Sequence, residues 1–127
     1  MSVSYLFEAE RGLLEKGPEI IVAIRKSDHG TVEQILAEDP NQINSVDFVT
    51  GQNAAMLCVS GRMPKLSAEV LQHAHALDLR HLDRFGHDLL DVAGLTGSEE
   101  LVDLVLEVYE RSGKHLLNNW PDEPSVT

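Results

Sequence analysis

The sequence predicts an all-α protein in which short helix-turn-helix units stack side by side as a helical solenoid. Apolar residues recur at helical spacing in short segments that end at glycine, proline or aspartate. A turn, a helix, a break and a second helix follow one another in two successive stretches, and the turn glycines Gly51 and Gly86 stand 35 residues apart. Aromatic residues make up only 5% of the chain, so aliphatic and alanine side chains must form the core.

The first half of the chain divides into three helical segments. Residues 4–16 place apolar side chains on one stripe and stop at Gly17-Pro18, which indicates a helix terminus. Residues 19–26 and 31–37 carry apolar residues at i, i+3 and i+4 spacing with a polar break between them. They predict two short helices joined by a tight turn, the second of which ends before Pro40.

Two further helix pairs are expected in the second half. The first comprises residues 53–60 and 66–77, and the second comprises residues 88–96 and 99–111. We therefore expect one domain over residues 1–127, composed of a capping helix at the N-terminus (1–17), three units (18–46, 47–82 and 83–113) and a tail (114–127). Leu116, Leu117 and Trp120 of the tail are expected to cover the last helix pair.

The last unit resembles the ankyrin repeat. Asp83-Arg84-Phe85-Gly86 stands at the family's turn, and Asp88-Leu89-Leu90-Asp91 stands where Thr-Pro-Leu-His is usual. Ala93 takes the place of the buried alanine and Gly97 that of the glycine between the helices, and residues 100–106 look like the second helix.

The other two units resemble the repeat less closely. The middle unit has Cys58 at the alanine position and an additional residue between Asp47 and Gly51, and the first unit lacks the leading turn but keeps Ala23. Small residues at this position let neighbouring helices approach closely. The resemblance covers about residues 18–111 and implies a short ankyrin-like stack of three units.

The resemblance also implies a concave binding face made from the turns and the first helices. The residues at the family's usual contact positions are Phe48, Val49, Gln52 and Ser60 in the middle unit, Arg84, Phe85, His87, Leu95 and Thr96 in the last, and Arg25 and Lys26 in the first. Phe48 and Phe85 are the favoured contacts, because an aromatic side chain held at a turn can fill a partner's pocket. The alternative is that either ring folds inward and joins adjacent turns.

Catalytic and metal chemistry have weaker support. Four histidines lie between His73 and His87, but His73 and His75 are two residues apart on a predicted helix and face different directions, so we expect no metal ligands. Cys58 is expected to be a core residue. No catalytic set of residues is found and no cofactor is implied, so an enzyme is not expected.

The charge of the chain bears on its partner. Acidic residues outnumber basic ones by 21 to 10, and the formal net charge of −11 disfavours nucleic acid and anionic membranes and favours a basic protein. The single cysteine excludes an internal disulfide, and no apolar run is long enough to span a membrane. We therefore expect a cytoplasmic protein.

The leading hypothesis is a protein-protein interaction module, an adaptor or inhibitor that binds a partner protein through the concave face. A sharper form is an inhibitor of the immunity or antitoxin type that covers a basic toxin or effector. The alternative is a small metal-binding protein or enzyme that uses the cluster from His73 to His87. A third is a structural role with self-association through Leu116, Leu117 and Trp120.

Overall fold

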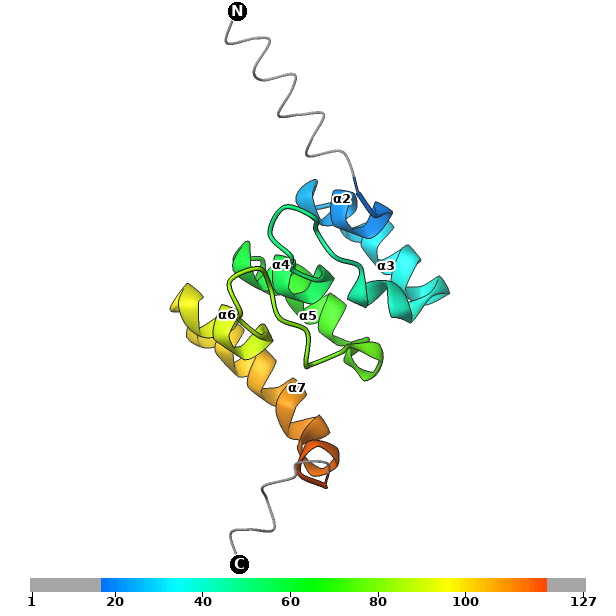
Figure 1. Cartoon of the computed structure of the whole chain (residues 1–127). Coiled ribbons are helices and arrows are strands. Elements are labelled where there is room, and N and C mark those ends of the chain that lie inside the picture. Colours follow the sequence, from blue (N-terminus) through cyan, green and yellow to red (C-terminus); the bar gives the residue numbers. More distant parts are fainter. Residues whose placement is uncertain (1–16, 119–127) are drawn as a thin grey trace, which may run out of the picture.

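The structure, a computed structural model, describes residues 17–118, and this part of the chain is all-helical (Figure 1). No strand occurs in it, although one isolated bridge pairs Val46 with Asn53. The prediction of an all-α fold is therefore confirmed. The helices are α2 (Glu19–Arg25), α3 (His29–Glu38), η1 (Pro40–Asn44), α4 (Ala54–Ser60), α5 (Pro64–Leu71), η2 (Ala74–Ala76), α6 (Leu89–Thr96) and α7 (Glu99–Asn118).

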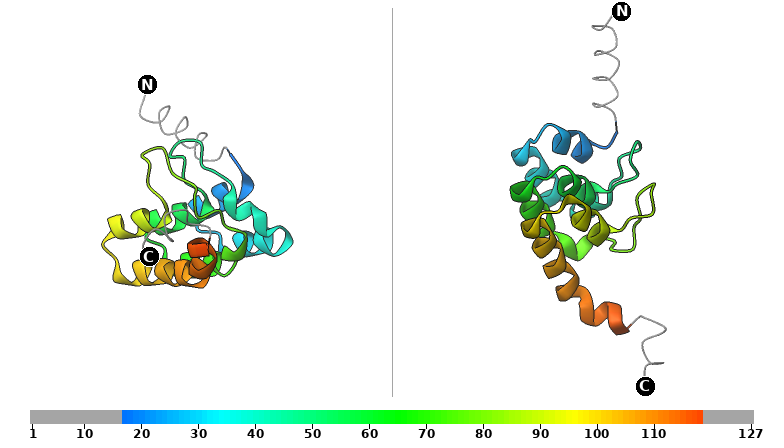
Figure 2. Two further views of the ribbon diagram at one scale, coloured as in Figure 1. Left: turned by 60° about the horizontal axis from the view of Figure 1, so that its bottom comes forward. Right: turned by 90° about the vertical axis from the view of Figure 1, so that its left-hand side faces the viewer.

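The α-helices form three pairs that lie next to one another in chain order. Within the pairs, α2 contacts α3, α4 contacts α5 and α6 contacts α7. Between the pairs, α4 contacts both α2 and α6, while α5 contacts both α3 and α7 (Figure 1). The first helices thus form one row and the second helices another, and the two long loops, residues 45–53 and 77–88, project to the same side (Figure 2).

Corresponding structural features recur at equivalent positions in the three pairs. Just after each first helix the chain adopts positive φ, at three residues spaced by 35 positions: Ser27 (55°), Arg62 (57°) and Gly97 (71°). A left-handed residue at a helix end reverses the chain sharply, and the second helices α3, α5 and α7 each begin two residues later. Asp28 and Ser98, at the starts of α3 and α7, accept the backbone N–H three residues on and so cap these helices.

One hydrophobic core runs through all three pairs. Ala23, Cys58 and Ala93, also spaced by 35 positions, are at most 5% exposed, as predicted from the small-residue pattern. Their size lets the first helices lie close to the helices behind them. Larger side chains fill the rest of the core; among them are Ile20, Ile24, Leu36, Met56, Leu66, Leu89 and Leu101.

Two helices differ from their predicted extent. The helix expected over residues 66–77 ends as α5 at Leu71, and the short η2 follows. After η2, the side chain of Asn44 donates to the carbonyl of Ala76 and accepts from the backbone N–H of Asp78, both at 2.8 Å. These two bonds hold the chain after η2 in a conformation that helical periodicity does not reveal.

The last helix is longer than predicted. It continues past Arg111 to Asn118, so residues 114–118 of the predicted tail belong to α7. Gly113 inside the helix costs only about 1 kcal/mol relative to alanine, and no proline stands before Pro121 to stop the chain. Residues 1–16 of the predicted capping helix, and the predicted contact through Trp120, lie outside the described residues.

Candidate functional site

The loop between the first two helix pairs turns about Asp47. Its backbone N–H donates to the carbonyl of Gln52 and its carbonyl accepts from Gly51, both at 2.8 Å. Its carboxylate accepts from the hydroxyl of Thr50 at 2.6 Å and from backbone N–H groups inside the turn, and it pairs with Arg25. The turn is therefore closed around one nearly inaccessible carboxylate.

Asp83 occupies the same place in the next loop. Its N–H donates to the carbonyl of His87 at 2.9 Å and its carbonyl accepts from Gly86 at 3.0 Å. One carboxylate oxygen accepts from the backbone N–H groups of Phe85 and His87, each at 2.9 Å. This turn is one residue shorter than the first, which accounts for the additional residue between Asp47 and Gly51 in the sequence.

Both carboxylates stay ionised despite their burial. Burial raises the pKa of Asp47, but hydrogen bonds from Thr50 and Arg25 outweigh it and hold the pKa below its usual value. Burial likewise raises the pKa of Asp83, and the backbone N–H groups of His87 and Phe85 reverse that effect. The two charges are therefore satisfied within the turns.

The two turns contact each other through their backbones. The N–H of Arg84 donates to the carbonyl of Thr50 at 3.1 Å, and its guanidinium donates to the carbonyl of Val49 at 2.9 Å. A ring nitrogen of His81 lies 2.7 Å from the carbonyl oxygen of Gly51. Gly51 has a φ of 74°, and a Cβ on it would lie 2.8 Å from the Arg84 nitrogen, so only glycine fits between the turns.

Aromatic side chains stand exposed on both turns. Phe48 is 58% exposed and Phe85 is 74% exposed, so the alternative in which either ring folds inward is wrong. The guanidinium carbon of Arg84 lies 5.7 Å from the centre of the Phe85 ring, close enough for a cation-π contact. Val49, Leu82 and Leu95 are also exposed large apolar residues, and Leu106 on α7 is a further one outside this region.

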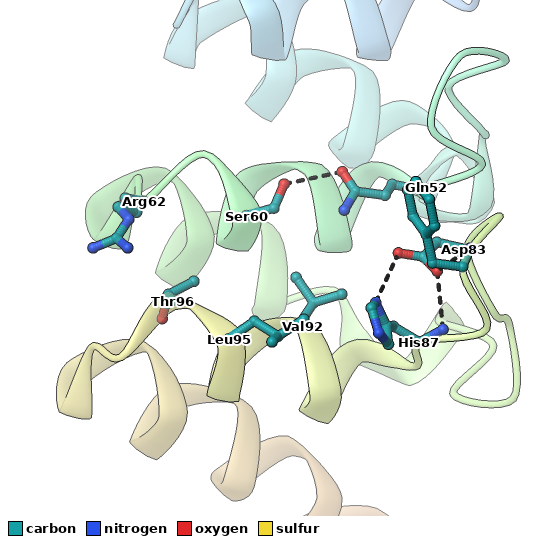
Figure 3. A pocket seen from close by; sticks show the side chains of 9 residues that line it. Gln52, Ser60, Arg62, Asp83, His87, Val92, Leu95 and Thr96 are labelled. Atoms are coloured by element: carbon teal, nitrogen blue, oxygen red, sulfur yellow. Dashed lines mark hydrogen bonds and ion pairs between the residues drawn. The ribbon is translucent and has the colours of Figure 1, made fainter.

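A cleft of about 280 Å³ lies between α4 and α6 and reaches the second turn (Figure 3). One wall carries Gln52 and Ser60, whose side chains are hydrogen-bonded to each other at 2.9 Å, and the facing wall carries Val92 and Leu95 (Figure 3). Arg62 lies at one end. The remaining lining residues are Thr96, Asp83, Phe85 and His87.

The structure divides the predicted contact residues of the middle and last units into two groups. Six of them line the cleft: Gln52, Ser60, Phe85, His87, Leu95 and Thr96. The other three, Phe48, Val49 and Arg84, lie on the turns beside it. Sequence reasoning missed the lining residues Arg62, Asp83 and Val92 as contacts. Arg62 stands 35 positions before Gly97, and an alignment of the units on that glycine would have found it.

The histidines do not gather into a metal site. His81 binds the carbonyl of Gly51, and a ring nitrogen of His87 lies 3.6 Å from the Asp83 carboxylate. The rings of His73 and His75 have centres 6.4 Å apart. Among residues 17–112, whose side chains the structure describes, no three His, Cys, Asp or Glu residues are arranged to hold a metal ion.

Cys58 is fully buried, as expected. Burial raises the pKa of its thiol to about 12, and the negative charge of Glu69 acts in the same direction. A thiol with such a pKa supplies almost no thiolate at neutral pH. The thiol of Cys58 is therefore not suited to act as a nucleophile.

Comparison with family models, curated protein sequences and solved structures gives no match to this chain. In the described range, no helix is long and apolar enough to cross a membrane.

Proposed function

We propose that the chain is a protein-binding module of three ankyrin-like units that acts in the cytoplasm as an adaptor or inhibitor. Its binding face is made of the two turns and the cleft between α4 and α6. We call this surface the turn-and-cleft face; its members are residues 48–52 and 82–87 together with Ser60, Arg62, Val92, Leu95 and Thr96.

The spacing of structural events supports the repeat part of the proposal. The left-handed residues, the buried small residues and the starts of the second helices all recur every 35 residues. Stacked units bury the apolar faces that each helix pair would leave uncovered alone. The paired turns at Asp47 and Asp83 agree with the turn of the ankyrin repeat.

The observation that carries the binding role is the group of exposed apolar side chains on one face. Phe48, Phe85 and Leu95 are each more than half exposed. Phe48 and Phe85 lie on the two long loops, and Leu95 lies on α6 and lines the cleft. Covering such a side chain stabilises a complex by about 1.5–3 kcal/mol, and exposed apolar groups concentrated on one surface mark interaction sites. The turns beneath them are held by hydrogen bonds, so binding them requires little ordering.

The chemistry of the site agrees with binding rather than turnover. Its carboxylates are hydrogen-bonded inside the turns, and the only cysteine is buried. A module of this kind acts by covering a surface of its partner. The net charge of −11 favours the approach of a basic protein at long range. Inhibition of a basic toxin or effector would be one form of this binding.

The test is affinity capture with the full chain as bait, in extract from the native source. We expect the wild type to retain a partner that the double variant Phe48→Ala/Phe85→Ala does not retain. Leu106→Ala is the matched control, because it removes an exposed apolar side chain from α7, away from the turn-and-cleft face. Thermal melts of the variants check that all three chains are folded.

Equal retention of the same proteins by the double variant would contradict the proposal, since the exposed rings would then contribute nothing. Loss of the partner with Leu106→Ala alone would place the interface on α7 instead.

A further inference from the structure

Among the described residues, the second helices carry more carboxylates than the first helices. Between Glu99 and Glu110, α7 carries five exposed carboxylates and no basic residue, and α3 adds Glu33 and Glu38. The first helices carry few charges: Glu19 and Arg25 in α2, none in α4 and Asp91 in α6. In the described part of the chain the second helices are therefore more acidic than the first helices, although Arg111 and Lys114 follow these carboxylates on α7.

The carboxylates near the turn-and-cleft face are already bonded. Asp47 and Asp83 are buried and satisfied within their turns. Asp88 and Asp91 form a reciprocal cap at the start of α6, in which each side chain accepts the backbone N–H of the other residue. Each of these carboxylates therefore has a structural role in a turn or a helix cap.

Arg62 is the exposed cation of the cleft. It lies at one end of the cleft, opposite the Asp83 and His87 end (Figure 3). Its guanidinium makes no hydrogen bond or ion pair with any other residue that the structure describes. Between the two ends the walls are formed by apolar Val92 and Leu95 and by the amide and hydroxyl of Gln52 and Ser60.

The backbone of Arg62 adds a second observation. Its φ of 57° is a left-handed conformation, which costs a residue with a side chain about 1–2 kcal/mol and glycine nothing. The third helix pair has Gly97 at the corresponding position, while the first has Ser27, whose φ of 55° is also left-handed. Of the three, only Arg62 places a long cationic side chain at the end of an open cleft.

We propose that the cleft binds an apolar and acidic segment of the partner protein: an apolar side chain seated against Val92, Leu95 and Phe85, with a neighbouring Asp or Glu carboxylate paired to Arg62. The proposal rests on the proposed function, because it assigns the partner's chemistry at the same face. It replaces the basic contact surface predicted from net charge with an acidic one at this position.

The experiment is a selection of random peptides displayed on phage against the immobilised full chain, followed by Kd measurements on enriched peptides. We expect enriched sequences that combine large apolar residues with Asp or Glu. Arg62→Glu and Arg62→Gly should both weaken binding by about threefold to fivefold, the effect of losing or reversing one charge pair. Lys65→Glu, which reverses an exposed cation on α5, is the matched control and should change Kd less than about twofold.

The outcomes separate this inference from the function on which it rests. Enrichment of Lys-rich or Arg-rich peptides that lose binding with Phe85→Ala would overturn the acidic segment and leave the face as the binding site. Binding of acidic peptides that is equal in wild type and Arg62→Glu would also overturn it. Peptides whose Kd is unchanged by both Phe85→Ala and Arg62→Glu would contradict the site and the inference together. Arg62→Gly relieves backbone strain, so weaker binding by that variant is not a consequence of unfolding.

Discussion

The contact between the two turns can be tested by adding one methyl group. Gly51 and Gly86 both have positive φ, at 74° and 82°, so alanine at either position has the same intrinsic cost of about 1 kcal/mol. The surroundings differ. A Cβ on Gly51 would lie 2.8 Å from the backbone nitrogen of Arg84, whereas a Cβ on Gly86 would have no atom within 4 Å.

The additional cost at Gly51 follows from the bonds that must break. To accept the methyl group the turns must separate, which removes the bond from the Arg84 N–H to the Thr50 carbonyl and the bond from its guanidinium to the Val49 carbonyl. Each such bond contributes about 1 kcal/mol. We therefore expect Gly51→Ala to lower the free energy of unfolding by about 3 kcal/mol and Gly86→Ala by about 1 kcal/mol.

The assay is urea unfolding of the full chain at pH 7, followed by circular dichroism at 222 nm, with free energies taken from midpoints at a common slope. Equal destabilisation by the two substitutions would refute the reasoning, because it would mean that the turns do not pack against each other in solution. A loss above about 2 kcal/mol for Gly86→Ala would refute the open surroundings assigned to that residue.

Three further predictions concern single residues. Arg62→Gly and Ser27→Gly should each raise the free energy of unfolding by up to about 1 kcal/mol, because glycine relieves the left-handed conformation; a loss of stability in the urea assay would contradict this. The lowered pKa of Asp47 means that its stabilising contribution is present above the unfolded value of about 3.9 and is lost as the pH falls through the lower folded value. Asp47→Ala should therefore reduce the free energy of unfolding at pH 7 by about 2 kcal/mol and weaken its dependence on pH in the acid range. An unchanged pH dependence would exclude the pairing of Asp47 with Arg25 as the source of that dependence. Cys58, whose thiol pKa is about 12, should resist a thiol reagent at pH 8 in the folded protein and react in urea, so rapid labelling without urea would contradict its burial.

The helical content of the protein could be predicted because its causes are local. Apolar residues at i, i+3 and i+4 define a helix face within a few residues, and glycine, proline and aspartate end helices through their own conformational preferences. The resemblance to the ankyrin repeat implied the small residues Ala23, Cys58 and Ala93, and all three are buried. The candidate contacts came from the resemblance to the ankyrin repeat, while the turns that carry Phe48 and Phe85 follow from their Asp and Gly residues.

Charge distribution was beyond this reasoning. The sequence determines a net charge of −11, but a sum carries no direction, and only the structure shows that α7 carries five exposed carboxylates while Arg62 stands at the end of the cleft. For that reason, the net charge predicts a basic partner, whereas the position of Arg62 leads us to propose an acidic segment.

By itself, the sequence determined an all-α chain of paired short helices, the small residues between them and the turns that carry Phe48 and Phe85. Only the tertiary structure decided that Asn44 holds the backbone at Asp78, that Gly51 lies against Arg84, and that Arg62 lines a cleft with Leu95. Each of these contacts joins residues about thirty positions apart, and their meeting depends on how helix pairs stack. Helical periodicity relates only residues a few positions apart. It therefore cannot predict these contacts, which form when the helix pairs pack against each other.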